Sequence, residues 1–137
     1  METARQLIRT PIIFIANDQL DDPYIYRQAF GKANPRAVLY FFLNRADLID
    51  ALQGEVYPRP SLLLMDWHMV AREGYAALAA LGRNPAWQTI PVVILSAPDR
   101  PVDEDQCRQT GYELVLPRQT GFDSLVGQLN GLMLALL

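Results

Sequence analysis

Residues 60–69 read PSLLLMDWHM, an unbroken apolar run that ends in a single carboxylate, Asp66. A run of this length, bounded by Pro58 and Pro60, is typical of a strand buried on both faces in a parallel sheet. An acid at the carboxyl end of such a strand lies where open α/β sheets place their ligand crevice. Because Asp66 could instead simply cap or end the strand, its role has to be judged from the rest of the chain.

The composition predicts one domain over residues 1–137, because 137 residues that are 50% hydrophobic support one proper core. The formal net charge of -3 gives no electrostatic case for direct nucleic-acid binding. The single cysteine, Cys107, cannot form an internal disulfide, which fits a reducing cytoplasm. Residues 1–10 lack the apolar core of a secretion signal, and no stretch is apolar enough to span a membrane.

Strand-like apolar runs alternate with segments of helical spacing along the whole chain. The predicted strands are residues 11–16, 37–43, 61–65, 90–95 and 113–116. The predicted helices are residues 24–33, 45–52, 75–81, 103–110 and 122–136. Asp22 and Asn44 are the expected caps of the first two helices, and residues 67–74 are expected to form a loop.

This alternation predicts an α/β fold, with a parallel sheet and helices on both of its faces. Four of the five predicted strands are closely followed by a polar residue that could line the crevice at the carboxyl edge. These residues are Asp18, Asp66, Ser96 and Arg118.

Over roughly residues 11–136, which would form the core of the domain, the chain resembles the receiver domains of response regulators in two-component signalling. Residues 62–74 are similar to the family pattern of an apolar strand, Asp, two residues, Met-Pro and later Asp-Gly. Residues 90–97, IPVVILSA, are similar to its I-P-V-V-x-x-[S/T]-A motif. The spacings from Asp66 to Ser96 (96 − 66 = 30) and from Ser96 to Arg118 (118 − 96 = 22) agree with the family. The resemblance implies a doubly wound, flavodoxin-like (βα)5 fold of five parallel strands in the order 2-1-3-4-5.

The resemblance also implies a set of site residues. Asp66 would accept a phosphoryl group, a reaction that needs a divalent cation and a fixed positive group to offset the charges. Mg²⁺ would be held by the carboxylates of Asp18 and Asp66 and by the backbone carbonyl of His68, since this ion prefers oxygen ligands. The Ser96 hydroxyl and the Arg118 side chain would bind the phosphoryl oxygens.

Several positions depart from the family pattern. Asn17 replaces the first of two acids at the end of the first strand, which should weaken the Mg²⁺ site. Arg118 replaces a nearly universal lysine and is not an equivalent phosphoryl clamp. Val115 replaces the aromatic residue that rotates inward on activation, while Val70 and Gln119 replace prolines.

Each site residue also has a simpler interpretation. Asp18 could be an ordinary loop acid. We expect Asp21 and Asp22 to be loop acids of this kind, with Asp22 also capping the first helix. Ser96 could satisfy backbone groups at a turn, and Arg118 could be a solvated surface arginine. His68 is expected at the rim of the site rather than as a general base, and Trp67 and residues 40–42 are expected in the core.

The favoured function is a stand-alone receiver without an output domain. It would be phosphorylated on Asp66 by a histidine kinase or phosphotransfer protein, and it would signal to a downstream protein. Catalysis would be limited to Mg²⁺-dependent self-phosphorylation and autodephosphorylation. The alternative is a pseudo-receiver, an interaction or dimerisation module that signals without phosphorylation. Apolar residues around the final helix, Leu134, Ala135 and Leu137, are compatible with a partner or homodimer surface.

Two other functions on related folds are disfavoured. Phosphatases similar to haloacid dehalogenases place a second Asp two positions after the nucleophile, where this chain has His68. A flavin carrier would need a phosphate-cradling loop after the first strand, where residues 17–22 are largely acidic.

Overall fold

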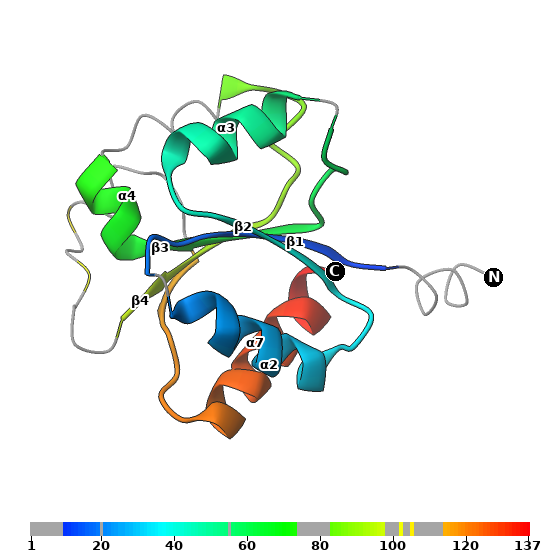
Figure 1. The fold of residues 1–137 in the computed structure, drawn as a ribbon, viewed down its shortest axis with the longest axis vertical. Helices are drawn as coiled ribbons and strands as arrows, with labels where there is room; N and C mark the ends of the chain where they lie inside the picture. Colours follow the sequence, from blue (N-terminus) through cyan, green and yellow to red (C-terminus); the bar gives the residue numbers. More distant parts are fainter. Residues whose placement is uncertain are drawn as a thin grey trace.

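The computed structural model describes residues 10–19, 21–54, 56–73, 83–97, 102, 105 and 114–137. Five parallel strands form one sheet in the order β2-β1-β3-β4-β5 (Figure 1). The strands are β1 Ile12–Ala16, β2 Val38–Phe42, β3 Leu62–Asp66, β4 Val92–Ser96 and β5 Val115–Pro117. The predicted fold class and strand order are therefore confirmed, with β3, the strand of the opening stretch, at the centre.

Helices cover both faces of the sheet. They are α2 Asp22–Ala33, α3 Arg45–Gln53, α4 Trp67–Glu73 and α7 Phe122–Leu136. Helices α2 and α7 lie on one face, while α3 and α4 lie on the other (Figure 1). The predicted helix at 75–81 lies outside the described residues, and so does nearly all of the one at 103–110.

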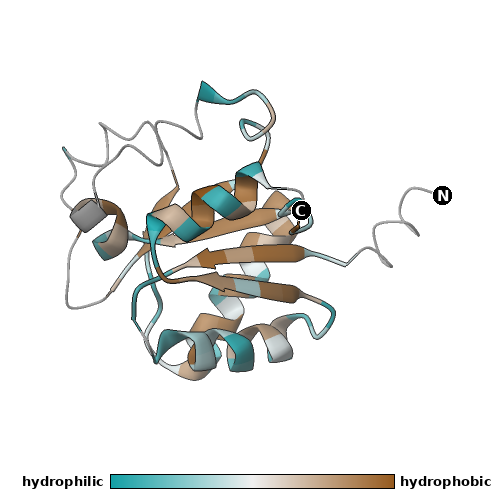
Figure 2. Ribbon diagram, turned by 45° about the horizontal axis from the view of Figure 1, so that its top comes forward, coloured by the Kyte–Doolittle hydropathy of each residue, from teal (hydrophilic) through white to brown (hydrophobic). Residues whose placement is uncertain are grey.

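The apolar run of β3 is unbroken because both of its faces are buried. Leu62 and Leu64 pack in the core layer shared with α2 and α7, whereas Leu63 and Met65 pack in the layer shared with α3 and α4. None of these four side chains is more than 2% exposed. Successive residues of a strand point to opposite faces, so a two-sided strand needs apolar residues at every position. Figure 2 shows a largely apolar sheet between helices in which polar and apolar residues are mixed.

The loop predicted for residues 67–74 is wrong, because α4 begins at Trp67, directly after β3. The backbone N–H of Met69 donates a hydrogen bond to Asp66 Oδ2 at 3.1 Å, which is the pattern of a helix N-cap. Trp67 and Val70 lie three positions apart and are both buried against the sheet. Asp66 is thus both the last residue of the central strand and the cap of the helix that follows it.

The two predicted helix caps have different outcomes. Asn44 caps α3 as expected, since its side chain accepts a hydrogen bond from the backbone N–H of Asp47 at 2.8 Å. The cap predicted at Asp22 is wrong: Asp21 occupies the N-cap position of α2 without a side-chain capping bond, and Asp22 is the first helical residue. The Asp22 carboxylate is engaged elsewhere, in the network described below.

The aromatic residues assigned to the core are found there. Trp67 and Phe42 are buried, and Tyr40 packs against the same core layer. Phe41 is half-buried against the opposite layer.

Candidate functional site

The predicted site residues gather at the carboxyl edge of the sheet. Asn17 and Asp18 follow β1, Asp66 ends β3, Ser96 ends β4, and Arg118 follows β5. The carboxyl ends of parallel strands share one edge, so strand order alone places the β1 and β4 residues on either side of Asp66.

Asp66 is a partly buried acid in a negatively charged setting. Burial raises the pKa of its carboxyl group, and the charges of Asp18 and Asp22 raise it further. The Met69 N–H bond and the nearby His68 oppose this rise in the pKa. A carboxylate crowded by two other acids is stabilised by a cation or by a positive side chain.

Asp18 is half-buried, and its Oδ1 accepts a hydrogen bond from the side chain of Gln19 at 3.2 Å. Asp18 follows β1, which pairs with β3, and its charge contributes to the raised pKa of Asp66. Carboxylate oxygens are the ligands that Mg²⁺ prefers, so the donor chemistry of this pair fits that ion. Within the described residues, no three His, Cys, Asp or Glu side chains gather to hold a metal. The predicted third ligand, the backbone carbonyl of the half-buried His68, is of a kind that such a count of side chains does not include.

Arg118 is held by an ion pair that the sequence did not predict. Its Nη1 donates to Asp22 Oδ2 at 2.8 Å, and the two side chains are only 20% and 13% exposed. The guanidinium carbon also lies 5.9 Å from the centre of the Tyr26 ring. Burial acts to lower the pKa of Arg118, but Tyr26 and Asp22 outweigh it and raise the pKa. The interpretation of Arg118 as a solvated surface residue is therefore wrong.

Asn17 completes this network. Its side chain is 4% exposed, and its Nδ2 donates to Asp22 Oδ2, the oxygen that also accepts from Arg118, at 2.8 Å. Its Oδ1 accepts from the backbone N–H of Gln19 at 2.7 Å. Asn17 is thus a fully engaged amide that orients Asp22.

Sequence analysis missed Asp22 and Tyr26 as site residues. Burial raises the pKa of Tyr26 to about 12, although the adjacent Arg118 acts in the opposite direction. The sequence did carry a signal for Asp22, namely the three carboxylates in residues 17–22. One helix cap accounts for only one of these acids, so the others needed a different role. Tyr26 gave no signal beyond an apolar position on the first helix.

The remaining site residues are buried or half-buried. Ser96 is 5% exposed, and its backbone oxygen accepts from the N–H of Arg118 at 2.8 Å, which joins the ends of β4 and β5. The role of the Ser96 hydroxyl stays a prediction. Val115 packs against the core layer of α3 and α4, as does Val70.

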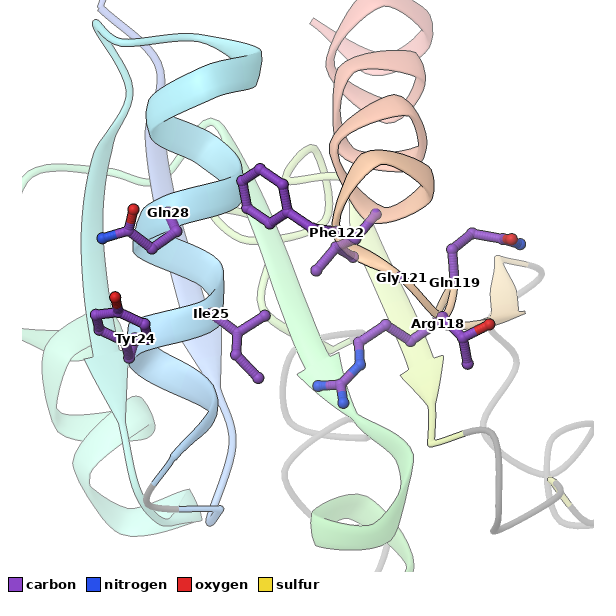
Figure 3. Close-up of a pocket in the computed structure, with 9 residues that line it drawn as sticks. Tyr24, Ile25, Gln28, Arg118, Gln119, Gly121 and Phe122 are labelled. Carbon is purple, nitrogen blue, oxygen red and sulfur yellow. The ribbon is translucent and has the colours of Figure 1, made fainter.

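A cavity of about 570 Å³ lies beside the site, between α2 and the start of α7 (Figure 3). Arg118 contributes to its wall together with residues of the two helices and the loop before α7. Those residues are Tyr24, Ile25, Gln28, Gln119, Thr120, Gly121, Phe122 and Leu125. Arg118 therefore connects the acidic edge of the sheet with a surface groove.

Among the residues that the structure describes, no helix combines the length and hydropathy needed to cross a lipid bilayer. No protein-family model matches the sequence, and no curated protein matches it.

Solved structures, in contrast, match over nearly the whole chain. The phosphorylated cyanobacterial phytochrome response regulator RcpA is 19% identical with a TM-score of 0.76, covering 93% of this chain and 94% of its own. The Mn²⁺-bound response regulator Rcp1 is 22% identical with a TM-score of 0.70, covering 89% and 91%. A receiver domain from Rhodospirillum rubrum is 19% identical with a TM-score of 0.71, covering 92% and 94%. The chain therefore has the fold of response-regulator receiver domains.

Proposed function

We propose that this chain is a receiver that accepts a phosphoryl group on Asp66. The observation that carries the proposal is the position of Asp66 at the end of the central strand, beside Asp18 and on the same edge as Ser96 and Arg118. The donor would be the phosphohistidine of a kinase or phosphotransfer protein in the cytoplasm. A carboxylate oxygen of Asp66 attacks phosphorus, an O–P bond forms, and the N–P bond to the imidazole breaks.

The other site residues have supporting roles in this proposal. Asp18, Asp66 and the backbone carbonyl of His68 would hold Mg²⁺, and the ion would supply positive charge to offset that of the incoming group. The Ser96 hydroxyl donates to a phosphoryl oxygen, and Arg118 offers a positive charge. Water attack on the phosphorus later restores the free carboxylate.

Output would pass through a protein contact. The outer side of α7 offers one surface, since Leu134 is 78% exposed and Leu137 47% exposed. A downstream protein or a second copy of the chain would bury such apolar side chains.

Two observations favour a second function, an interaction module that signals without phosphorylation. Arg118 is paired with Asp22, and Val115 offers no aromatic ring to rotate. This alternative predicts partner binding that is unaffected by Asp66→Asn and by Mg²⁺.

Tryptophan fluorescence during a titration with Mg²⁺ and beryllofluoride tests the proposed receiver function. Trp67 is buried directly after Asp66, so binding of this phosphoryl mimic should change its emission. Trp67→Phe should remove the change, whereas Trp87→Phe should retain it. The proposal fails if the wild-type signal is flat, or if Asp66→Asn responds like the wild type.

A further inference from the structure

Asp22 stands out because it is an acid of the site edge that comes from a helix rather than from a strand end. It is the first residue of α2, five positions after Asn17. One of its oxygens, Oδ2, accepts from both Asn17 and Arg118 at 2.8 Å. The arrangement spans the ends of β1 and β5, two strands that do not pair with each other.

The pairing is strong enough to control where Arg118 points. Both side chains are largely buried, and a hydrogen bond between two charged groups is stronger than one between neutral groups when solvent screening is limited. The amide of Asn17 fixes the acceptor, so the guanidinium has a prepared partner before any phosphoryl group arrives.

Arg118 directly follows β5 and Asp66 ends β3, so both residues lie at the carboxyl edge of the same sheet. The Arg118 backbone N–H bonds to the carbonyl of Ser96, and β4 pairs directly with β3. Asp22, which holds the guanidinium, acts electrostatically on Asp66. A phosphoryl group on Asp66 would therefore compete with Asp22 for the same positive charge.

We propose that Asp22 is a positioning residue for Arg118: it supplies the counter-ion that position 17 lacks and restrains the guanidinium until a phosphoryl group competes for it. This inference rests on the proposed function of Asp66. In this proposal, Asn17 and Asp22 together orient Arg118. The carboxylate of Asp22, on α2, pairs with the guanidinium, and the amide of Asn17, at the end of β1, orients that carboxylate.

A double-mutant cycle tests the proposal through the affinity for beryllofluoride in the presence of Mg²⁺. Asp22→Asn keeps an acceptor for Asn17 but removes the charge that holds Arg118, so the affinity should rise about tenfold. In an Arg118→Gln background, Asp22→Asn should raise the affinity much less, because only the direct repulsion between Asp22 and the site is then removed. Asp21→Asn is the matched control, because this substitution removes the same charge one residue away. The Asp21 side chain is exposed and forms no capping bond.

The outcomes separate this inference from the proposed function. If the wild type binds the mimic and Asp22→Asn binds it no more tightly, only the inference is overturned. The same holds if Asp22→Asn raises the affinity equally in the wild-type and Arg118→Gln backgrounds. If only the Asp22→Asn protein binds, the inference stands and the wild-type chain is not a working receiver. If no variant binds, both are overturned.

Discussion

Asn17 shows how one residue change can be absorbed by a neighbour. The receiver pattern usually has an acid at this position, and here a buried amide donates to the carboxylate of Asp22. In this chain, the carboxylate that pairs with Arg118 comes from the start of α2, and the amide of Asn17, directly after β1, donates to that carboxylate.

Restoring the acid with Asn17→Asp should destabilise the protein by about 2 kcal/mol, because a donor is lost and two carboxylates then face each other. The crowding raises the pKa of the new group, so the loss should shrink as the pH falls and the group takes up a proton. Urea unfolding at neutral and mildly acidic pH measures this. Adding Asp22→Asn should recover most of the stability; an Asn17→Asp protein as stable as the wild type would contradict the network.

At neutral pH, the ionised carboxylate of Asp66 should reduce the stability of the metal-free protein. Burial and the neighbouring acids raise the pKa of Asp66 above its value in the unfolded chain. The protonated carboxyl group therefore stabilises the fold below the unfolded pKa, and this contribution is lost as the pH rises through the folded pKa. Asp66→Asn keeps an acceptor for the Met69 N–H and removes the charge. In a chelating buffer, this variant should unfold at a higher urea concentration at neutral pH, and the gain should fade toward acidic pH. A gain that is independent of pH would argue against this electrostatic cause.

At the scale of single elements, the junction of β3 and α4 shows a limit of sequence analysis. The apolar run predicted the strand to within one residue, but Trp67 to Glu73 gave no clear helical pattern, and the glycine at position 74 suggested a loop. The deciding contact is local, a carboxylate accepting from an N–H three residues later. A cap can be recognised in a sequence only when the helix beyond it is recognised too.

Helix α3 shows the opposite case, in which the cap was predictable. Asn44 accepts from the backbone N–H of Asp47 and also donates to its side chain at 3.2 Å. Asn44→Ala should therefore cost about 1 kcal/mol in the free energy of unfolding, while Asn44→Ser should restore most of it. Equal stability of Ala and Ser at this position, measured by thermal unfolding, would exclude a capping role.

At the scale of the whole molecule, the sequence predicted the sheet because every central strand is apolar on both faces. Burial on two sides leaves a continuous apolar run in each central strand, and the ends of these strands then give the edge where the site lies. The pairing of Arg118 with Asp22 could not be predicted in this way. It joins residues 96 positions apart, and it depends on how α2 sits against the end of β5.

The receiver fold by itself does not determine whether Asp66 is used. The measurement that decides this is the intact mass of the protein after incubation with Mg²⁺ and a small phosphoryl donor, compared with Asp66→Asn under the same conditions. We predict an increase of one phosphoryl group in the wild type that needs Mg²⁺ and is absent from the variant. An unchanged wild-type mass, or an adduct that persists in Asp66→Asn, would contradict the proposed function.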